Sequence, residues 1–190
     1  MLPENVLKQG DAVLAVDVQN DFCPGGALAV EDGDKVVPVL NRWIEAAQKK
    51  GVPVVASRDW HTLSHCSFKA QGGPWPEHCV QDTHGAEYHP DLALPADAVR
   101  VSKGTAFDKD AYSAFDGTGL AGYLKDRGIE RLWIGGLAQD VCVLETVKEA
   151  CHHGFETHVL VPATRPVDPD KADIVLREMR EVGAILEEAG

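Results

Sequence analysis

Short apolar runs alternate along the chain with longer segments in which apolar residues recur every three or four positions. Such runs are typical of strands buried on both faces of a parallel sheet, and such segments are typical of amphipathic helices. The runs predict strands at 11–16, 53–57, 98–101, 131–134 and 158–161, with a last edge strand at 184–186. The periodic segments predict helices from Asp34 to Gly51, at 120–125, from Asp140 to His153 and from Asp168 to Gly183, with Asp34 and Asp168 as N-caps.

This alternation predicts a single α/β domain over residues 1–190, with three α/β/α layers around an open, mostly parallel sheet. Residues 58–97 break the pattern, because they have no helical period and contain five of the eight histidines and two tryptophans. Linkers are seldom rich in these residues, so we expect a long functional loop region here.

The net charge and the cysteine content indicate which partners and which cell compartment to expect. The chain carries 18 Lys and Arg against 30 Asp and Glu, a net charge of −12, which argues against nucleic acids and anionic membranes as partners. It has an odd number of cysteines, five, and no CxxC, which favours a reducing cytoplasm over a disulfide framework. We find no signal-peptide pattern and no apolar run as long as a membrane span. A cytoplasmic protein with a small-molecule substrate is expected; its oligomeric state, a homo-oligomer included, stays open.

The first candidate for chemistry is Cys142, which follows the strand 131–134 and a glycine-containing turn. It falls in the first turn of a helix, where free N–H groups and the helix dipole favour a thiolate and could hold an oxyanion. Asp17 and Lys103 also follow predicted strands, and the carboxyl ends of parallel strands share one edge of the sheet. A carboxylate there could take the thiol proton while a lysine stabilises the charges. The alternative is a small buried cysteine, a loop-capping aspartate and a solvated lysine.

The second candidate is a metal site. Asp59 and His61 are two positions apart on extended chain and so face the same side, and His78 follows in the histidine-rich loop. One carboxylate and two imidazoles suit Zn, Fe or Mn and leave coordination positions open for water. His65 could be a fourth ligand or a group that supports a ligand.

Three further patterns bear on these assignments. A structural zinc site could use Cys66 or Cys79. Residues 61–65 are not a zincin helix, because the required glutamate is absent at position 62. The G-x-G-x-x-G match at 117–122 follows no convincing strand, so we interpret it as a flexible helix start rather than a dinucleotide site.

Several motifs, in this order along nearly the whole chain, resemble those of the nicotinamidase/pyrazinamidase family in the isochorismatase-like cysteine hydrolase superfamily. They are DVQNDF at 17–22, GGAL at 25–28, RDWH at 58–61, WPEHCV at 75–80, SKG at 102–104 and DVCV at 140–143. The Cys–Lys–Asp set belongs to the superfamily as a whole, whereas the metal motif points to nicotinamidase.

The resemblance implies specific roles for the site residues. It implies an Asp17–Lys103–Cys142 triad and an oxyanion hole made by the N–H groups of Ala138 and Cys142, with a cis peptide bond before Ala138. It implies aromatic side chains around a pyridine ring and one divalent metal, zinc above iron or manganese. The aromatic residues are Phe22, Trp75 and Tyr112, and the metal ligands are Asp59, His61 and His78.

The implied activity is that of a metal-dependent cysteine amidase that converts nicotinamide to nicotinate and ammonia through a thioester, and that also accepts pyrazinamide. Two features depart from the family pattern: Gln139 stands where threonine is usual, and Thr164-Arg165-Pro166 differs from the familiar sequence. Another amidase or isochorismatase-like hydrolase, or a non-catalytic ligand-binding protein on the same fold, therefore stays open as an alternative.

Overall fold

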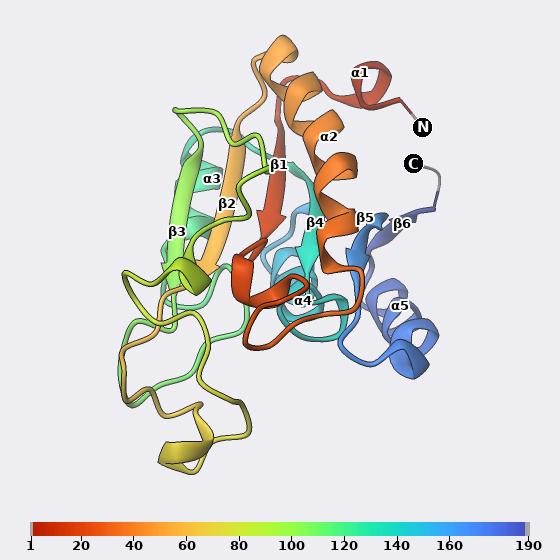
Figure 1. Ribbon diagram of the computed structural model, residues 1–190. Helices are drawn as coiled ribbons and strands as arrows, with labels where there is room; N and C mark the ends of the chain where they lie inside the picture. The colour runs from red at the N-terminus through yellow and green to blue at the C-terminus, as the bar shows by residue number, and fades with distance from the viewer. Residues whose placement is uncertain (1, 189–190) are drawn as a thin grey trace.

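Six parallel strands form one sheet in the order β3-β2-β1-β4-β5-β6 (Figure 1). The computed structural model describes residues 2–188, so residues 1 and 189–190 of the predicted domain lie outside the described part. The α/β fold, the parallel sheet and the last edge strand are confirmed. The strands are β1 (Asp11–Val16), β2 (Val54–Asp59), β3 (Val99–Lys103), β4 (Arg131–Leu137), β5 (Glu156–Arg165) and β6 (Ile185–Glu187).

Helices cover both faces of the sheet. They are α1 (Pro3–Val6), α2 (Val36–Lys50), α3 (Leu120–Asp126), α4 (Leu144–His152) and α5 (Ala172–Glu181). Helix α2 packs on one face, while α3, α4 and α5 pack on the other (Figure 1). In β1, Val13 and Ala15 enter the first core, and Leu14 and Val16 enter the second. Both faces are buried, which explains why the strand is an unbroken apolar run.

Several boundaries differ from the prediction. Asp34 does not cap α2, because it lies inside a 3-10 turn, Gly33–Lys35, that leads into the helix. The expected helix from Asp140 begins instead as a π-helical segment, Gln139–Val143, that continues into α4. Asp168 caps the 3-10 turn Pro169–Lys171 that leads into α5, because its side chain accepts from the Asp170 N–H at 3.2 Å. The other 3-10 turns are Asn20–Phe22, Lys69–Gln71 and His84–Ala86.

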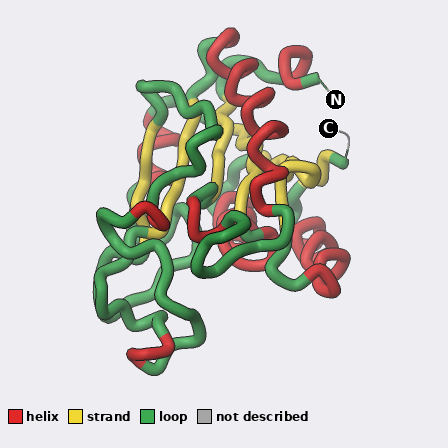
Figure 2. Tube along the Cα trace, in the orientation of Figure 1, coloured by secondary structure: helices red, strands yellow, loops and turns green. Residues whose placement is uncertain are grey.

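The strand order places the functional edge. Strand β1 lies between β2 and β4, so the chain leaves the sheet centre in both directions, and open α/β sheets bind ligands beside such a switch point. The loops at 60–98 and 104–119 extend beyond the carboxyl ends of the strands (Figure 2). None of the helices within residues 2–188 combines the length and hydropathy needed to cross a bilayer.

Candidate active site

Asp17 is the first residue after β1, and its side chain is fully buried. Its φ of 48° is in the left-handed region, which costs a residue with a Cβ about 1 kcal/mol and turns the chain sharply out of the strand. Oδ1 accepts a hydrogen bond from the Ser57 hydroxyl at 2.7 Å. Oδ2 forms an ion pair with Lys103 Nζ at 2.7 Å, and the carboxylate is also close enough to the Cys142 thiol to affect its pKa. This position would allow the carboxylate to exchange a proton with that thiol.

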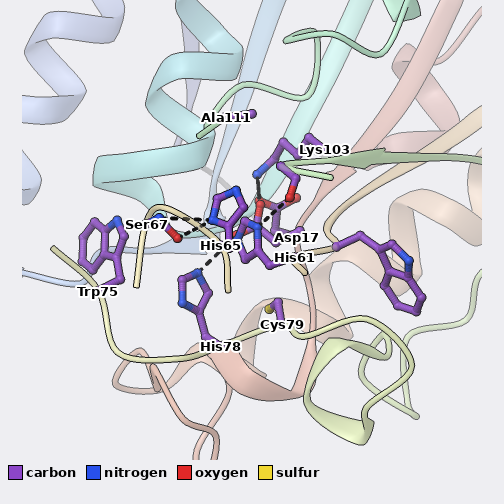
Figure 3. Close-up of polar contacts among 12 residues, drawn as sticks. Asp17, His61, His65, Ser67, Trp75, His78, Cys79, Lys103 and Ala111 are labelled. Carbon is purple, nitrogen blue, oxygen red and sulfur yellow. Dashed lines mark hydrogen bonds and ion pairs between the residues drawn. The ribbon is translucent and has the colours of Figure 1, made fainter. Parts of the chain in front are cut away.

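Lys103 ends β3 and pairs in register with Asp59 at the end of β2. Its Nζ lies 2.5 Å from Asp59 Oδ1, 2.7 Å from Asp17 Oδ2 and 3.4 Å from Cys142 Sγ. Burial alone would lower the pKa of Lys103, but the two carboxylates raise it well above its usual value. A buried ammonium held between two carboxylates is a fixed positive charge beside the Cys142 sulfur. Figure 3 shows Lys103 next to Asp17.

Cys142 lies in the π-helical segment after β4 and is 6% exposed. The Ala138 carbonyl accepts from the N–H groups of Val141 (3.1 Å) and Val143 (3.0 Å). The widened turn thus skips the Cys142 N–H, which an α-helix would have bonded to that carbonyl. Among the described residues the Ala138 N–H has no acceptor, and the Leu137–Ala138 peptide bond is cis, as the resemblance implied. In this part of the chain the Ala138 N–H is therefore unbonded, and the Cys142 N–H is not bonded to the Ala138 carbonyl.

The electrostatics of the cysteine differ from the expected thiolate. Burial raises the pKa of Cys142 well above its usual value; Lys103 opposes this shift, while the charges of Asp17 and Asp59 add to it. Burial also raises the pKa of Asp17, against the effect of Lys103. Burial raises the pKa of Cys142 more than the helix N-terminus lowers it, so the resting cysteine is a thiol. It lies beside the Asp17 carboxylate, whose pKa is also raised.

Asp59, His61 and His78 come together as predicted, and each offers one ligand atom within 4.8 Å of the others. Asp59 Oδ2 lies 3.4 Å from His61 Nε2 and 3.7 Å from His78 Nε2. The opposite ring nitrogens face carbonyls at 2.8 Å, those of Gly104 and Pro76. A carbonyl accepts only, so each Nδ1 carries the proton and each Nε2 turns a lone pair toward the carboxylate. This donor set fits a divalent transition metal.

His65 lies beside this cluster without joining it. Its ring stacks on His61 with centroids 4.0 Å apart, Nδ1 bonds to the Ser67 hydroxyl at 2.7 Å, and Nε2 lies 3.2 Å from the Lys109 carbonyl (Figure 3). Both ring nitrogens of His65 have hydrogen-bond partners, so in this geometry His65 packs against His61 and offers no nitrogen to a metal ion. Cys66 and Cys79 belong to neither cluster of possible metal ligands found in residues 2–188.

Two supporting residues were missed by the sequence analysis. Gln19 is fully buried, and its side-chain nitrogen donates to the carbonyls of Asp59 (2.8 Å) and Ala86 (2.9 Å) while its oxygen accepts from the Asp59 N–H (2.8 Å). Gly104 has φ +60°, and a Cβ there would lie 2.5 Å from His61 Cε1. Their signal in the sequence is their place in the DVQNDF and SKG motifs, close to Asp17 and Lys103.

The three aromatic residues, Cys142 and the three possible metal ligands line one pocket. Within it, Trp75 Nε1 donates to the Tyr112 hydroxyl at 3.3 Å. The departures from the family pattern lie outside its lining, where the buried Gln139 side chain donates to Thr164 Oγ1 at 2.7 Å. The sequence analysis missed five of the lining residues. The full lining is Phe22, Leu28, Asp59, His61, Trp75, His78, Asp110, Ala111, Tyr112, Ala138, Val141, Cys142 and Val167.

The isochorismatase domain model matches residues 11–189, so the chain belongs to the isochorismatase family. Within that class it is 40% identical to the nicotinamidase of Escherichia coli (strain K12), over 92% of this chain and 93% of the relative. The pyrazinamidase of Pyrococcus horikoshii, solved in complex with zinc, superposes with a TM-score of 0.92 at 45% identity, covering 95% of this chain and 99% of that one. PnC1 from L. infantum, in complex with nicotinate, superposes with a TM-score of 0.87 at 35% identity, covering 96% and 95%.

Proposed function

We propose that this protein is a metal-dependent cysteine amidase that hydrolyses nicotinamide to nicotinate and ammonia and also accepts pyrazinamide. The observation that carries the proposal is one pocket lined by Cys142 and by three possible metal ligands. Lys103 contacts the Cys142 sulfur from behind the pocket wall and is ion-paired with Asp17. The similarity to nicotinamidases and to a zinc-bound pyrazinamidase supports the same activity.

Formation of the thioester follows from the positions of four groups. Asp17 Oδ2 takes the thiol proton as Cys142 Sγ attacks the carboxamide carbon. The N–H groups of Ala138 and Cys142 donate to the oxyanion, and removal of one such donor in other hydrolases costs a factor of about 100 to 1,000 in rate. Lys103 balances the negative charge that moves between sulfur and carboxylate. Asp17 returns its proton to the leaving nitrogen, and ammonia departs.

Hydrolysis of the thioester uses the same groups, with water as the nucleophile and the Cys142 sulfur as the leaving group. Asp17, again a carboxylate, accepts a proton from the attacking water, and the same two N–H groups bind the second oxyanion. The C–S bond then breaks, the proton returns to the Cys142 sulfur, and nicotinate is released. One water is consumed for each ammonia formed.

Asp59, His61 and His78 would hold the divalent metal, and zinc is the ion we favour. When bound, the ion supplies a Lewis acid for a borderline donor such as a pyridine nitrogen. The aromatic residues Phe22, Trp75 and Tyr112 would bracket the ring and hold the carboxamide near Cys142. The proposal places the protein in the cytoplasm as a single domain.

The test is ammonia release from nicotinamide by the purified protein after removal of metal and after reloading with zinc. We expect one nicotinate per ammonia, activity restored by zinc, and activity toward pyrazinamide. Zinc binding without ammonia release would instead identify a ligand-binding protein. Release from other carboxamides but not from nicotinamide would identify a different amidase.

A further inference from the structure

The charged groups that line the pocket are all acidic. Among the lining residues, Asp59 and Asp110 carry carboxylates, and there is no lysine or arginine. Asp59 is ion-paired from behind with Lys103 at 2.5 Å and belongs to the metal-ligand set. Asp110 forms no salt bridge with any group in residues 2–188, so it is the lining carboxylate without an ion-pair partner. Carboxylates are usually bound by arginine or lysine, and the lining offers neither; its cation would be the metal held by Asp59, His61 and His78.

Asp110 lies beside the aromatic wall of the pocket. Its Oδ1 accepts from the Ala111 N–H at 2.9 Å. Burial and the nearby Asp110 carboxylate raise the pKa of Tyr112, whose hydroxyl accepts from Trp75 Nε1 at 3.3 Å. A negative charge thus lies next to two of the aromatic residues that line the same pocket.

We propose that Asp110 is a specificity-determining residue that disfavours carboxylate ligands. It favours a neutral carboxamide over the acid that the reaction produces, and over anionic substrates in general. The inference rests on the proposed function, in which a neutral substrate becomes an anionic product at one site. Repulsion between Asp110 and the new carboxylate would speed product release and limit inhibition by the acid. Asp59, the other carboxylate of the pocket lining, cannot have this role, because it is ion-paired with Lys103.

The experiment compares two ligands of one shape, nicotinamide and nicotinate, by calorimetry on zinc-loaded protein. The background is Cys142→Ala, in which nicotinamide stays intact. Asp110→Asn removes the charge but keeps the shape of the side chain, whereas Asp110→Ala removes both. Asp108→Asn is the matched control, since Asp108 is exposed on the same loop and does not line the pocket.

We expect Asp110→Asn to raise the affinity for nicotinate relative to nicotinamide on the order of fivefold, and added salt to shrink that difference. Asp108→Asn should leave the ratio unchanged. Asp110→Ala should weaken both ligands through the aromatic wall and shift the ratio in the same direction. An unchanged ratio in Asp110→Asn, or the same shift in Asp108→Asn, would overturn the proposal. Ammonia release by the Cys142→Ala background would instead overturn the proposed function.

Discussion

Replacement of Gly104 by alanine tests whether the His61 ring must occupy its present position. The added Cβ would lie 2.5 Å from His61 Cε1 and 2.7 Å from Nδ1, whereas ordinary contacts begin at 3.4 Å. The ring or the loop must therefore move by about 0.9 Å, far beyond the roughly 0.2 Å tolerance of a metal–ligand bond. The shift also disturbs the 2.8 Å bond between Nδ1 and the Gly104 carbonyl. Loss of such a supporting bond weakens metal binding about 10- to 100-fold, or about 1.4 to 2.8 kcal/mol.

The matched control for this variant is Gly117→Ala. Gly117 has φ +70°, nearly that of Gly104, but a Cβ there would meet nothing within 4 Å. Both variants carry the left-handed backbone penalty of about 1–2 kcal/mol, which thermal unfolding measures. Only Gly104→Ala should lose zinc affinity in competition with a chromogenic chelator. Equal zinc affinities for the two variants would refute the role assigned to the Gly104–His61 contact.

Two further substitutions test other parts of the account. Asp17→Asn should cut turnover by about 100-fold or more and slow alkylation of Cys142, because an amide cannot take the thiol proton; a normal alkylation rate would argue against Asp17 as the base. Asp11→Asn should destabilise the fold by about 3 kcal/mol at pH 7, because buried Asp11 accepts from the Arg131 guanidinium at 2.7 and 2.8 Å. Burial alone would raise the pKa of Asp11, but Arg131 lowers it. The stabilisation is therefore complete above the unfolded pKa of about 3.9 and lost as pH falls through the lower folded value. Urea unfolding should show the two proteins converging below about pH 4; a constant difference would contradict this assignment.

The residues that sequence reasoning placed together are those at strand ends. Asp17, Lys103 and Cys142 follow apolar runs, and parallel strands carry such residues to one edge of the sheet. The sequence pattern therefore predicts their proximity without any side-chain geometry. The fold class follows from the same runs, because a strand buried on both faces is apolar throughout.

The features that were not predictable depend on tertiary contacts. The helical period around Cys142 cannot distinguish a π turn from an α turn, since the difference lies in which N–H the Ala138 carbonyl accepts from. The thiol form of Cys142 depends on how much chain covers it, and burial outweighs the favourable helix end. Asp110 faces the pocket only because its loop folds over the strand ends, and no spacing in the sequence signals this.

The central claim is that Cys142 is the nucleophile of an amidase. The most direct measurement is ammonia release from nicotinamide by the zinc-loaded protein and by Cys142→Ala, with zinc content and thermal unfolding recorded for both. The account predicts turnover in the first protein and a loss of about 1,000-fold or more in the second, at equal zinc content and with an intact fold. Substantial ammonia release by folded, zinc-loaded Cys142→Ala would contradict it.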